Sequence, residues 1–173
     1  MLTKNFYQAL NTALLNKTAI VTTSAGAVET FNRGAVITSN QWNLFNAMTY
    51  RSTNSPESFP GVFFGTDATP ATASDYDLGS IIPSSNMSVI VPTEVSFNVT
   101  NEYQEYTATY GVHNKTEEAI SITEIGLFTG FGSDGSLYRC LVDRTVLDAP
   151  VTIPAGQSKQ ITYTIRFNYG GAV

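Results

Sequence analysis

The stretch Gln160-Ile-Thr-Tyr-Thr-Ile-Arg-Phe-Asn-Tyr169 decides the fold class of this chain. Its apolar and aromatic residues alternate strictly with Thr, Arg and Asn, which is the period of a β-strand with one buried face. Two upstream segments, Glu94–Asn101 and Glu105–His113, alternate in the same way and are joined by a short polar connection that suits a hairpin loop. The C-terminal half is therefore predicted to be antiparallel β-structure.

The segment Ala119–Thr129 also reads as a strand, but its phase changes in the middle. The apolar residues that change parity are Ile120 and Ile122 before the break, and Ile125 and Leu127 after it. Because a regular strand cannot move its apolar side chains from one face to the other, we predict a β-bulge at Thr123–Glu124. Further strands are predicted at 137–141 and 151–153, with Asp134-Gly135 as a turn signal.

The N-terminal part of the chain has a helical period instead. Residues 3–16 carry an apolar stripe with a spacing of four, which predicts an amphipathic helix. The residues of that stripe are Phe6, Leu10 and Leu14. A second short helix is expected over Gln41–Met48, where Trp42 and Phe45 are three positions apart.

These patterns predict a mainly β protein, an antiparallel β-sandwich with an N-terminal amphipathic helix or arm. We expect two units, an N-terminal helical arm with its connecting segment at 1–55 and the sandwich at 56–173. Residues 66–88 are rich in Ser, Thr and Pro and read as a long irregular stretch. A loop of this length inside a compact domain indicates function or a contact surface.

The composition excludes several classes of protein. The 173 residues carry a net charge of −5 and only 13% charged side chains, whereas 23 Thr, 15 Ser and 13 Asn make up close to a third of the chain. A sequence pI near 4.7 disfavours nucleic-acid binding through a basic face. One Cys cannot form an internal disulfide, and one Cys with one His is a poor set of transition-metal ligands. The apolar stretches are far too short to span a bilayer.

Candidate catalytic groups are few. Acidic pairs of the kind that hydrolyse glycosidic bonds occur at Asp75/Asp77, Glu117/Glu118 and Asp143/Asp148. Each pair lies in or near a polar turn, where carboxylates are ordinary, and a small hydrolase that uses Asp75 and Asp77 stays as an alternative. Asp75-Tyr76-Asp77 has oxygen ligands for Ca²⁺ but lacks the Gly and the distal Glu of an EF-hand loop.

His113 and Cys140 are the remaining residues with chemically reactive side chains. His113 has no nucleophile next to it and is interpreted as a surface histidine at a strand end. Cys140 lies in a predicted strand and is interpreted as a small buried residue, with a thiolate favoured by Arg139 as the alternative. We therefore assign no catalytic, cofactor-binding or metal-binding residue.

The C-terminal half contains a series of motifs with a familiar order. Ile122-Thr-Glu-Ile-Gly-Leu-Phe128 is followed by a Gly/Asp turn, by Arg144-Thr-Val-Leu147, and by a Pro154-Ala-Gly turn before the final Thr-rich strand. Together with the upstream Phe64-Gly-Thr-Asp-Ala-Thr-Pro70, this order resembles small virion proteins of tailed bacteriophages. The resemblance covers roughly residues 60–169. It implies a structural role in the tail, baseplate, fibre or head, and it carries over no catalytic residue.

The expected function is therefore that of a non-enzymatic virion component, made in the host cytoplasm and located in the virion. Its expected partners are copies of itself and other virion proteins, because a surface with few charges suits repeated assembly. A β-sandwich that binds host-surface glycan and a capsid decoration protein are the alternatives. The residues expected at an interface are Phe6, Leu10, Leu14, Trp42, Phe45, Asp75, Tyr76 and Asp77.

Overall fold

The computed structural model describes residues 1–8, 19–31, 61–90, 95–133 and 136–168, and this part of the chain is mainly β. Residues 4–8 are helical, and the rest of the predicted N-terminal helix, with Leu10 and Leu14, lies outside the described residues. Trp42 and Phe45 lie outside them as well. The strands are β1 (Ala19–Thr22), β2 (Val28–Phe31), β3 (Gly61–Gly65), β4 (Met87–Ile90), β5 (Val95–Val99), β6 (Tyr103–Asn114), β7 (Ile120–Ser133), β8 (Ser136–Ile153) and β9 (Ser158–Asn168).

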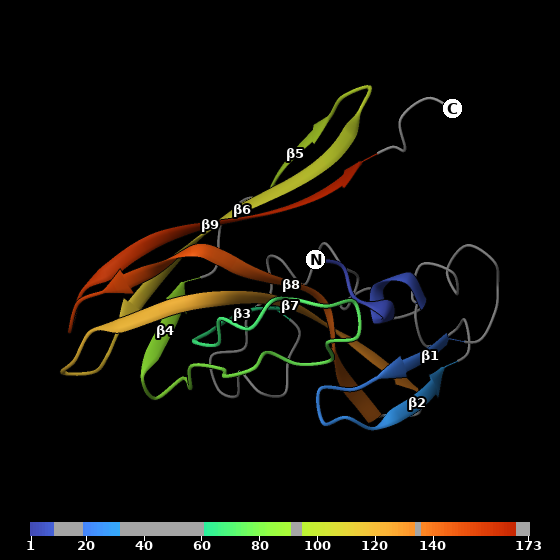
Figure 1. The fold of residues 1–173 in the computed structure, drawn as a ribbon, viewed down its shortest axis with the longest axis horizontal. Coiled ribbons are helices and arrows are strands. Elements are labelled where there is room, and N and C mark those ends of the chain that lie inside the picture. The colour runs from blue at the N-terminus through green and yellow to red at the C-terminus, as the bar shows by residue number, and fades with distance from the viewer. Residues whose placement is uncertain (9–18, 32–60, 91–94, 134–135, 169–173) are drawn as a thin grey trace.

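The strands form three antiparallel sheets (Figure 1). β1 and β2 are a hairpin, and β3, β7 and β8 form a second sheet in the order β3-β7-β8. In the third sheet β6 is central, with β9 along one edge and with β4 and β5 one after the other along the opposite edge. Tyr106, for example, lies opposite Phe97 of β5 and opposite Ile165 of β9.

The alternation predicted for the last strand is confirmed by the burial of its side chains. Ile161, Tyr163 and Ile165 of β9 are buried, and the residues between them are exposed. They belong to one apolar cluster with buried residues of β6, β7 and β8. Across that cluster the ring of Phe64 on β3 meets the ring of Tyr110 on β6, edge to face, with 6.1 Å between centroids. One face of each large sheet therefore contributes to the same core.

A register irregularity lies where the bulge was predicted, but its extra residues belong to β8, because two steps along β7 face five steps along β8. Ile122 pairs with Val151, whereas Glu124 pairs with Val146, so the register shifts between them. The shift lets Ile122 and Ile125 both reach the apolar cluster, and it leaves Glu124 buried on the other side of the sheet. The parity change in the sequence thus marks the position at which the charged side chain of Glu124 is buried.

The first residues of the chain lie along β8. The amide of Thr3 donates to the carbonyl of Val142, and the amide of Arg144 donates to the carbonyl of Met1, both at 3.0 Å. Phe6 is 92% buried in the apolar cluster, where its ring lies 5.4 Å from that of Phe167. Within the described ranges, no helix has the length and apolar character that a membrane span requires.

Candidate functional site

The irregular stretch between β3 and β4 packs onto the face of the β3-β7-β8 sheet that points away from β6 and β9. Its two ends are held to β3 and to each other by backbone hydrogen bonds, from Thr66 to Ser80 and from Ile82 to Phe64, each 2.9 Å long. Between them Leu78 is buried against the sheet. The side chains that pack together there are Phe63, Leu78, Phe128 and Leu141. This stretch is therefore an ordered cover on the sheet.

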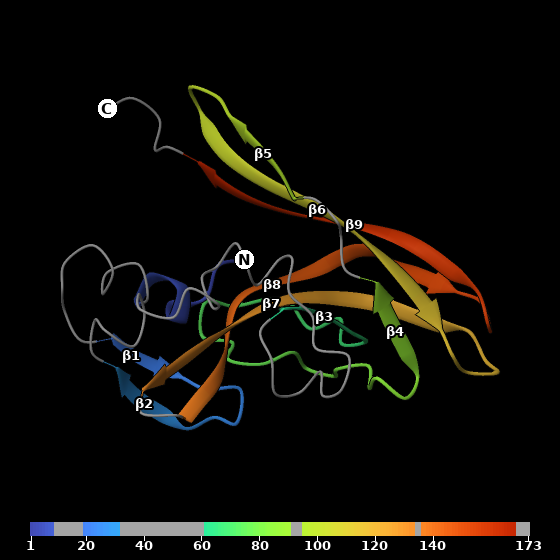
Figure 2. The ribbon, with the colours of Figure 1, turned by 180° about the vertical axis from the view of Figure 1, so that it is seen from behind.

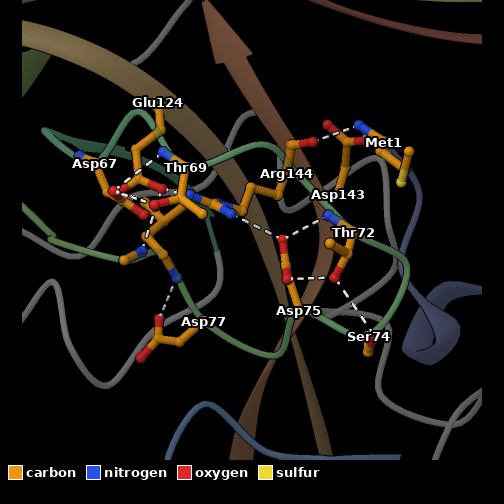
Figure 3. Close-up of polar contacts among 12 residues, drawn as sticks. Met1, Asp67, Thr69, Thr72, Ser74, Asp75, Asp77, Glu124, Asp143 and Arg144 are labelled. Atoms are coloured by element: carbon orange, nitrogen blue, oxygen red, sulfur yellow. Dashed lines mark hydrogen bonds and ion pairs between the residues drawn. The ribbon is translucent and has the colours of Figure 1, made fainter.

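A buried arginine, Arg144, makes three ion pairs that hold this cover in place (Figure 3). Arg144 of β8 donates from Nε to Glu124 at 2.8 Å, from Nη1 to Asp75 at 2.9 Å and from Nη2 to Asp67 at 2.9 Å. We call these four residues the Arg144 cluster. A guanidinium presents its donors on three nitrogens in a fixed plane, so one side chain can bind three carboxylates that lie apart from one another. The cluster joins β7, β8 and two points of the cover.

Glu124 is the acidic residue at the base of the cluster and is fully buried. Its carboxylate also accepts hydrogen bonds from the backbone amides of Asp67, Gly79 and Ser80, at 3.3, 3.2 and 2.9 Å. A Cβ added at Gly65 would come within 2.7 Å of the carbonyl oxygen of Ser80 and would also meet the Glu124 side chain. Glycine at this position lets the cover approach the carboxylate.

The structure places three of the predicted interface residues in or next to this cover. Asp75 belongs to the Arg144 cluster, and Asp77 pairs with Arg139 at 3.5 Å. Tyr76 between them is 46% exposed. The two carboxylates thus bind different arginines of the same strand, and the side chain that remains accessible is the tyrosine.

The aspartates of the cover have shifted pKa values. The amide and hydroxyl of Thr69, with Arg144, hold the pKa of Asp67 below its ordinary value. Burial raises the pKa of Asp75, but hydrogen bonds from Thr72 and Arg144 outweigh burial and leave the pKa lowered. Burial raises the pKa of Asp77 despite the nearby Arg139. The first two aspartates therefore favour the folded cover in their charged form.

We expect acid to destabilise the protein through this cover. A carboxyl whose pKa is lowered by folding stabilises the folded state above its ordinary pKa near 4, and this contribution is lost as the pH falls further. Asp77, whose pKa is raised, acts in the opposite direction. Urea unfolding followed by far-UV circular dichroism from pH 6 to pH 3 should show stability falling below about pH 4.

Two variants test the source of that pH dependence. The double variant Asp67→Asn/Asp75→Asn should lose stability at pH 6 and should show a flatter dependence on pH below 4. Glu117→Gln, at an exposed carboxyl, is the matched control and should follow the wild type. An equal pH slope in the wild type and the double variant would show that other carboxyls determine the acid sensitivity.

Asp143, the neighbour of Arg144, points to the other side of β8 and into the core. It accepts a 2.6 Å hydrogen bond from the hydroxyl of Tyr163 on β9. It also forms an ion pair with the amino group of Met1, 3.1 Å away. Burial, followed by the charge of Asp143, raises the pKa of Tyr163 well above its ordinary value, so the phenol stays a donor. Adjacent residues of one strand thus hold the cover on one face and link β8 to β9 on the other.

Cys140 and His113, the two single residues with reactive side chains, are both held by contacts within the fold. Cys140 is fully buried, as interpreted from the sequence, and burial raises its thiol pKa to about 12, which removes the thiolate alternative. His113 on β6 is hydrogen-bonded through Nδ1 to the hydroxyl of Ser158 on β9, at 3.0 Å. Ser158 thus supplies a hydroxyl beside His113 that the sequence did not indicate, and within the described ranges no carboxylate is hydrogen-bonded to this imidazole.

Beyond the cluster, the β6–β9 pair presents an outward face of paired hydroxyls. Thr107 lies 3.0 Å from Thr164, and Thr109 lies 3.0 Å from Thr162, oxygen to oxygen. At the end of this row, Arg166 binds Glu105 at 2.6 Å and neutralises it. Thr side chains therefore line the outer face of these two strands, and each cross-strand pair of hydroxyls shares one hydrogen bond.

The sequence reasoning missed Glu124 and Arg144 as partners. The signal for Glu124 was nonetheless present, because it is the one charged residue of the predicted strand Ala119–Thr129 in a chain with few charges. Such a residue needs a buried partner. The sequence does not identify that partner.

The described ranges offer no cluster of three or more His, Cys, Asp or Glu side chains that could hold a metal ion. Comparison of this chain with protein-family models, with curated proteins and with solved structures gave no match.

Proposed function

We propose that this protein is a non-enzymatic structural component of a tailed phage virion, in the tail or at a head–tail or fibre attachment. It assembles with copies of itself and with other virion proteins through neutral surfaces rich in Thr and Asn. The two large sheets are proposed to be the layers of a β-sandwich, with the N-terminal residues as an arm. The motif order over residues 60–169 supports this proposal.

The observation that carries the proposal is the outward face of β6 and β9. Covering a polar surface is costly when its groups lose hydrogen bonds to water. Here Thr107 and Thr109 already bind their partners on β9, and Glu105 is neutralised by Arg166. A partner that covers this face therefore needs to supply only one acceptor for each Thr pair, and it meets an ion pair that is already formed. The same face is a weak site for catalysis, because its polar groups are committed to each other.

The test is the presence of the protein in purified particles. Virions should be isolated by density gradient from the bacterium that produces the phage encoding this chain, and then analysed by quantitative mass spectrometry. We expect the protein in the particle at a fixed ratio to the other components. It should stay bound in 1 M NaCl, because contacts between neutral surfaces are screened little by salt. A protein abundant in the lysate and missing from the particles would overturn the proposal.

A pair of variants assigns the contact to the outward face. Thr109→Lys/Thr162→Lys places two charges on that face and should reduce incorporation at least tenfold when the variant replaces the wild type in the phage. Ser85→Lys, at an exposed position of the turn before β4, is the control and should be incorporated normally. Equal incorporation of both variants would place the contact elsewhere on the molecule.

A further inference from the structure

Strand β5 forms an edge of its sheet, and no other described strand pairs with its outer side. Its sequence, Val95-Ser-Phe-Asn-Val99, contains no charge. Phe97 is 56% exposed and Val99 is 54% exposed. Figures 1 and 2 show that β5 and the adjoining part of β6 project beyond the layer formed by β7 and β8. Proteins normally protect such an edge with charges, prolines or a covering segment.

The hairpin between β5 and β6 shows which backbone groups face the open side. The amide of Thr100 donates to the carbonyl of Tyr103, so this is a hydrogen-bonded pair. Antiparallel ladders alternate between bonded and non-bonded pairs, and β5 pairs with β6 without a register shift. Asn98 and Ser96 therefore bond to β6. The N–H and C=O groups of Val95, Phe97 and Val99 point outward.

The same strand is self-complementary about Phe97. In an antiparallel pair of two β5 strands related by a two-fold axis at this residue, Phe97 lies opposite Phe97 and Val95 opposite Val99. The apolar side chains then share one face, while Ser96 and Asn98 meet on the other. Each outward N–H meets an outward C=O. We propose that β5 is the docking strand for a second copy of this chain, forming a sheet that continues from one copy into the other.

Several features favour a second copy as the occupant. The contact is isologous, so one surface supplies both halves, and the absence of charge removes like-charge repulsion across the axis. Phe97 stacks on Tyr106 with 4.8 Å between ring centroids, so it is held toward the face that the pair would extend. The opposite edge of the sheet, β9, carries the exposed Lys159, a charge that discourages edge pairing.

The size of the contact sets its strength. Five residues of strand extend about 17 Å. Two strands of this length bury less surface area than the ~1,200 Å² that stable interfaces bury. We therefore expect a reversible dimer that is populated at high concentration. Neighbouring copies in a particle have a high effective concentration. In this respect the inference deepens the proposed function and rests on it, because it names one surface of the proposed self-assembly.

The experiment uses cysteine crosslinking of the full chain. In the proposed pair the two Phe97 positions are a hydrogen-bonded pair about 5.5 Å apart at Cα, within the range of a disulfide. Phe97→Cys should form a covalent dimer in high yield under mild oxidation. Ser96→Cys is the control, because it faces Asn98 of the other copy and lies about 8 Å from its own counterpart. The native thiol, Cys140, is fully buried.

Hydrogen exchange of the wild-type protein gives a second readout. The amide of Phe97 should become protected as the concentration rises, whereas the amide of Ser96, bonded to β6, should be protected at every concentration. Equal crosslinking of both cysteine variants, or a Phe97 amide whose exchange ignores concentration, would overturn the inference. A protein that enters virions without this pairing would leave the proposed function standing. Pairing in solution without incorporation into virions would support the docking strand and would contradict the proposed function.

Discussion

Replacing Arg144 by Met should destabilise the protein by about 3–5 kcal/mol, the usual cost of removing one partner of a buried ion pair. The substitution keeps an unbranched apolar stem but removes the guanidinium that binds Glu124. Glu124 is fully buried, so its charge would remain without a counter-charge. Asp67 and Asp75 would lose their common partner, and the cover over the β3-β7-β8 sheet would loosen.

The matched control is Arg166→Met. Arg166 also binds a carboxylate, that of Glu105, but its side chain is 51% exposed, and exposed pairs contribute only about 0–1 kcal/mol. Urea unfolding should separate the two variants by several kcal/mol, and limited proteolysis should cut the 66–82 segment faster in Arg144→Met. If the two substitutions lower the free energy of unfolding equally, the Arg144 cluster stabilises the protein no more than an exposed ion pair does.

A third variant distinguishes the charge from the shape of the cluster. Glu124→Gln keeps the volume and the acceptor oxygen of the side chain, so some of the backbone amides at Gly79 and Ser80 still have a partner. Arg144 keeps Asp67 and Asp75. We therefore expect a smaller loss, about 1–3 kcal/mol, which is the range for an imperfectly satisfied buried group.

The sequence predicted the parts of the fold that depend on neighbouring residues. The period of two placed β5, β6 and β9 to within a few residues, because alternation is a local property of a strand with one buried face. The position of the irregularity at Thr123–Glu124 was predicted for the same reason, since a parity change is visible within a few positions. These features need no knowledge of what the strand packs against.

The Arg144 cluster depends on residues that are distant in sequence. Its hydrogen bonds span 20 positions to Glu124, 69 to Asp75 and 77 to Asp67. Alternation and turn chemistry contain no information at that range. The stretch 66–88 was accordingly predicted as irregular, which is correct for most of it, but its attachment to the chain's own sheet was not foreseen.

Exposure is a further limit of the sequence pattern. Phe97 alternates with polar neighbours as a core residue does, and its ring does lie on the same face as Tyr106. The pattern gives the face of the sheet but not whether another layer covers it. Phe97 is in fact more than half exposed, so its ring is accessible to a second copy at this edge.

Replacing Phe64 by Ala should cost about 3–5 kcal/mol, the usual loss for a buried aromatic ring. Phe64 is 1% exposed and extends from β3 toward Tyr110 of β6, which is 2% exposed. These rings belong to different sheets, so their contact tests whether the sheets pack face to face as the proposed sandwich requires. The milder Phe64→Leu is the second variant, for use if Phe64→Ala does not fold.

A double-mutant cycle isolates the contact between the sheets. Phe64→Leu and Tyr110→Leu, measured singly and together by urea unfolding, should give a coupling energy of about 0.5–1.5 kcal/mol, typical of an aromatic pair. Phe63→Leu is the matched control, because Phe63 is buried on the opposite face against Phe128 and should add to Tyr110→Leu without coupling. Zero coupling at Phe64, or equal coupling at both phenylalanines, would contradict the face-to-face packing. The control isolates the effect of the sheet face, because Phe63 and Phe64 are neighbouring residues of the same type on opposite faces of β3.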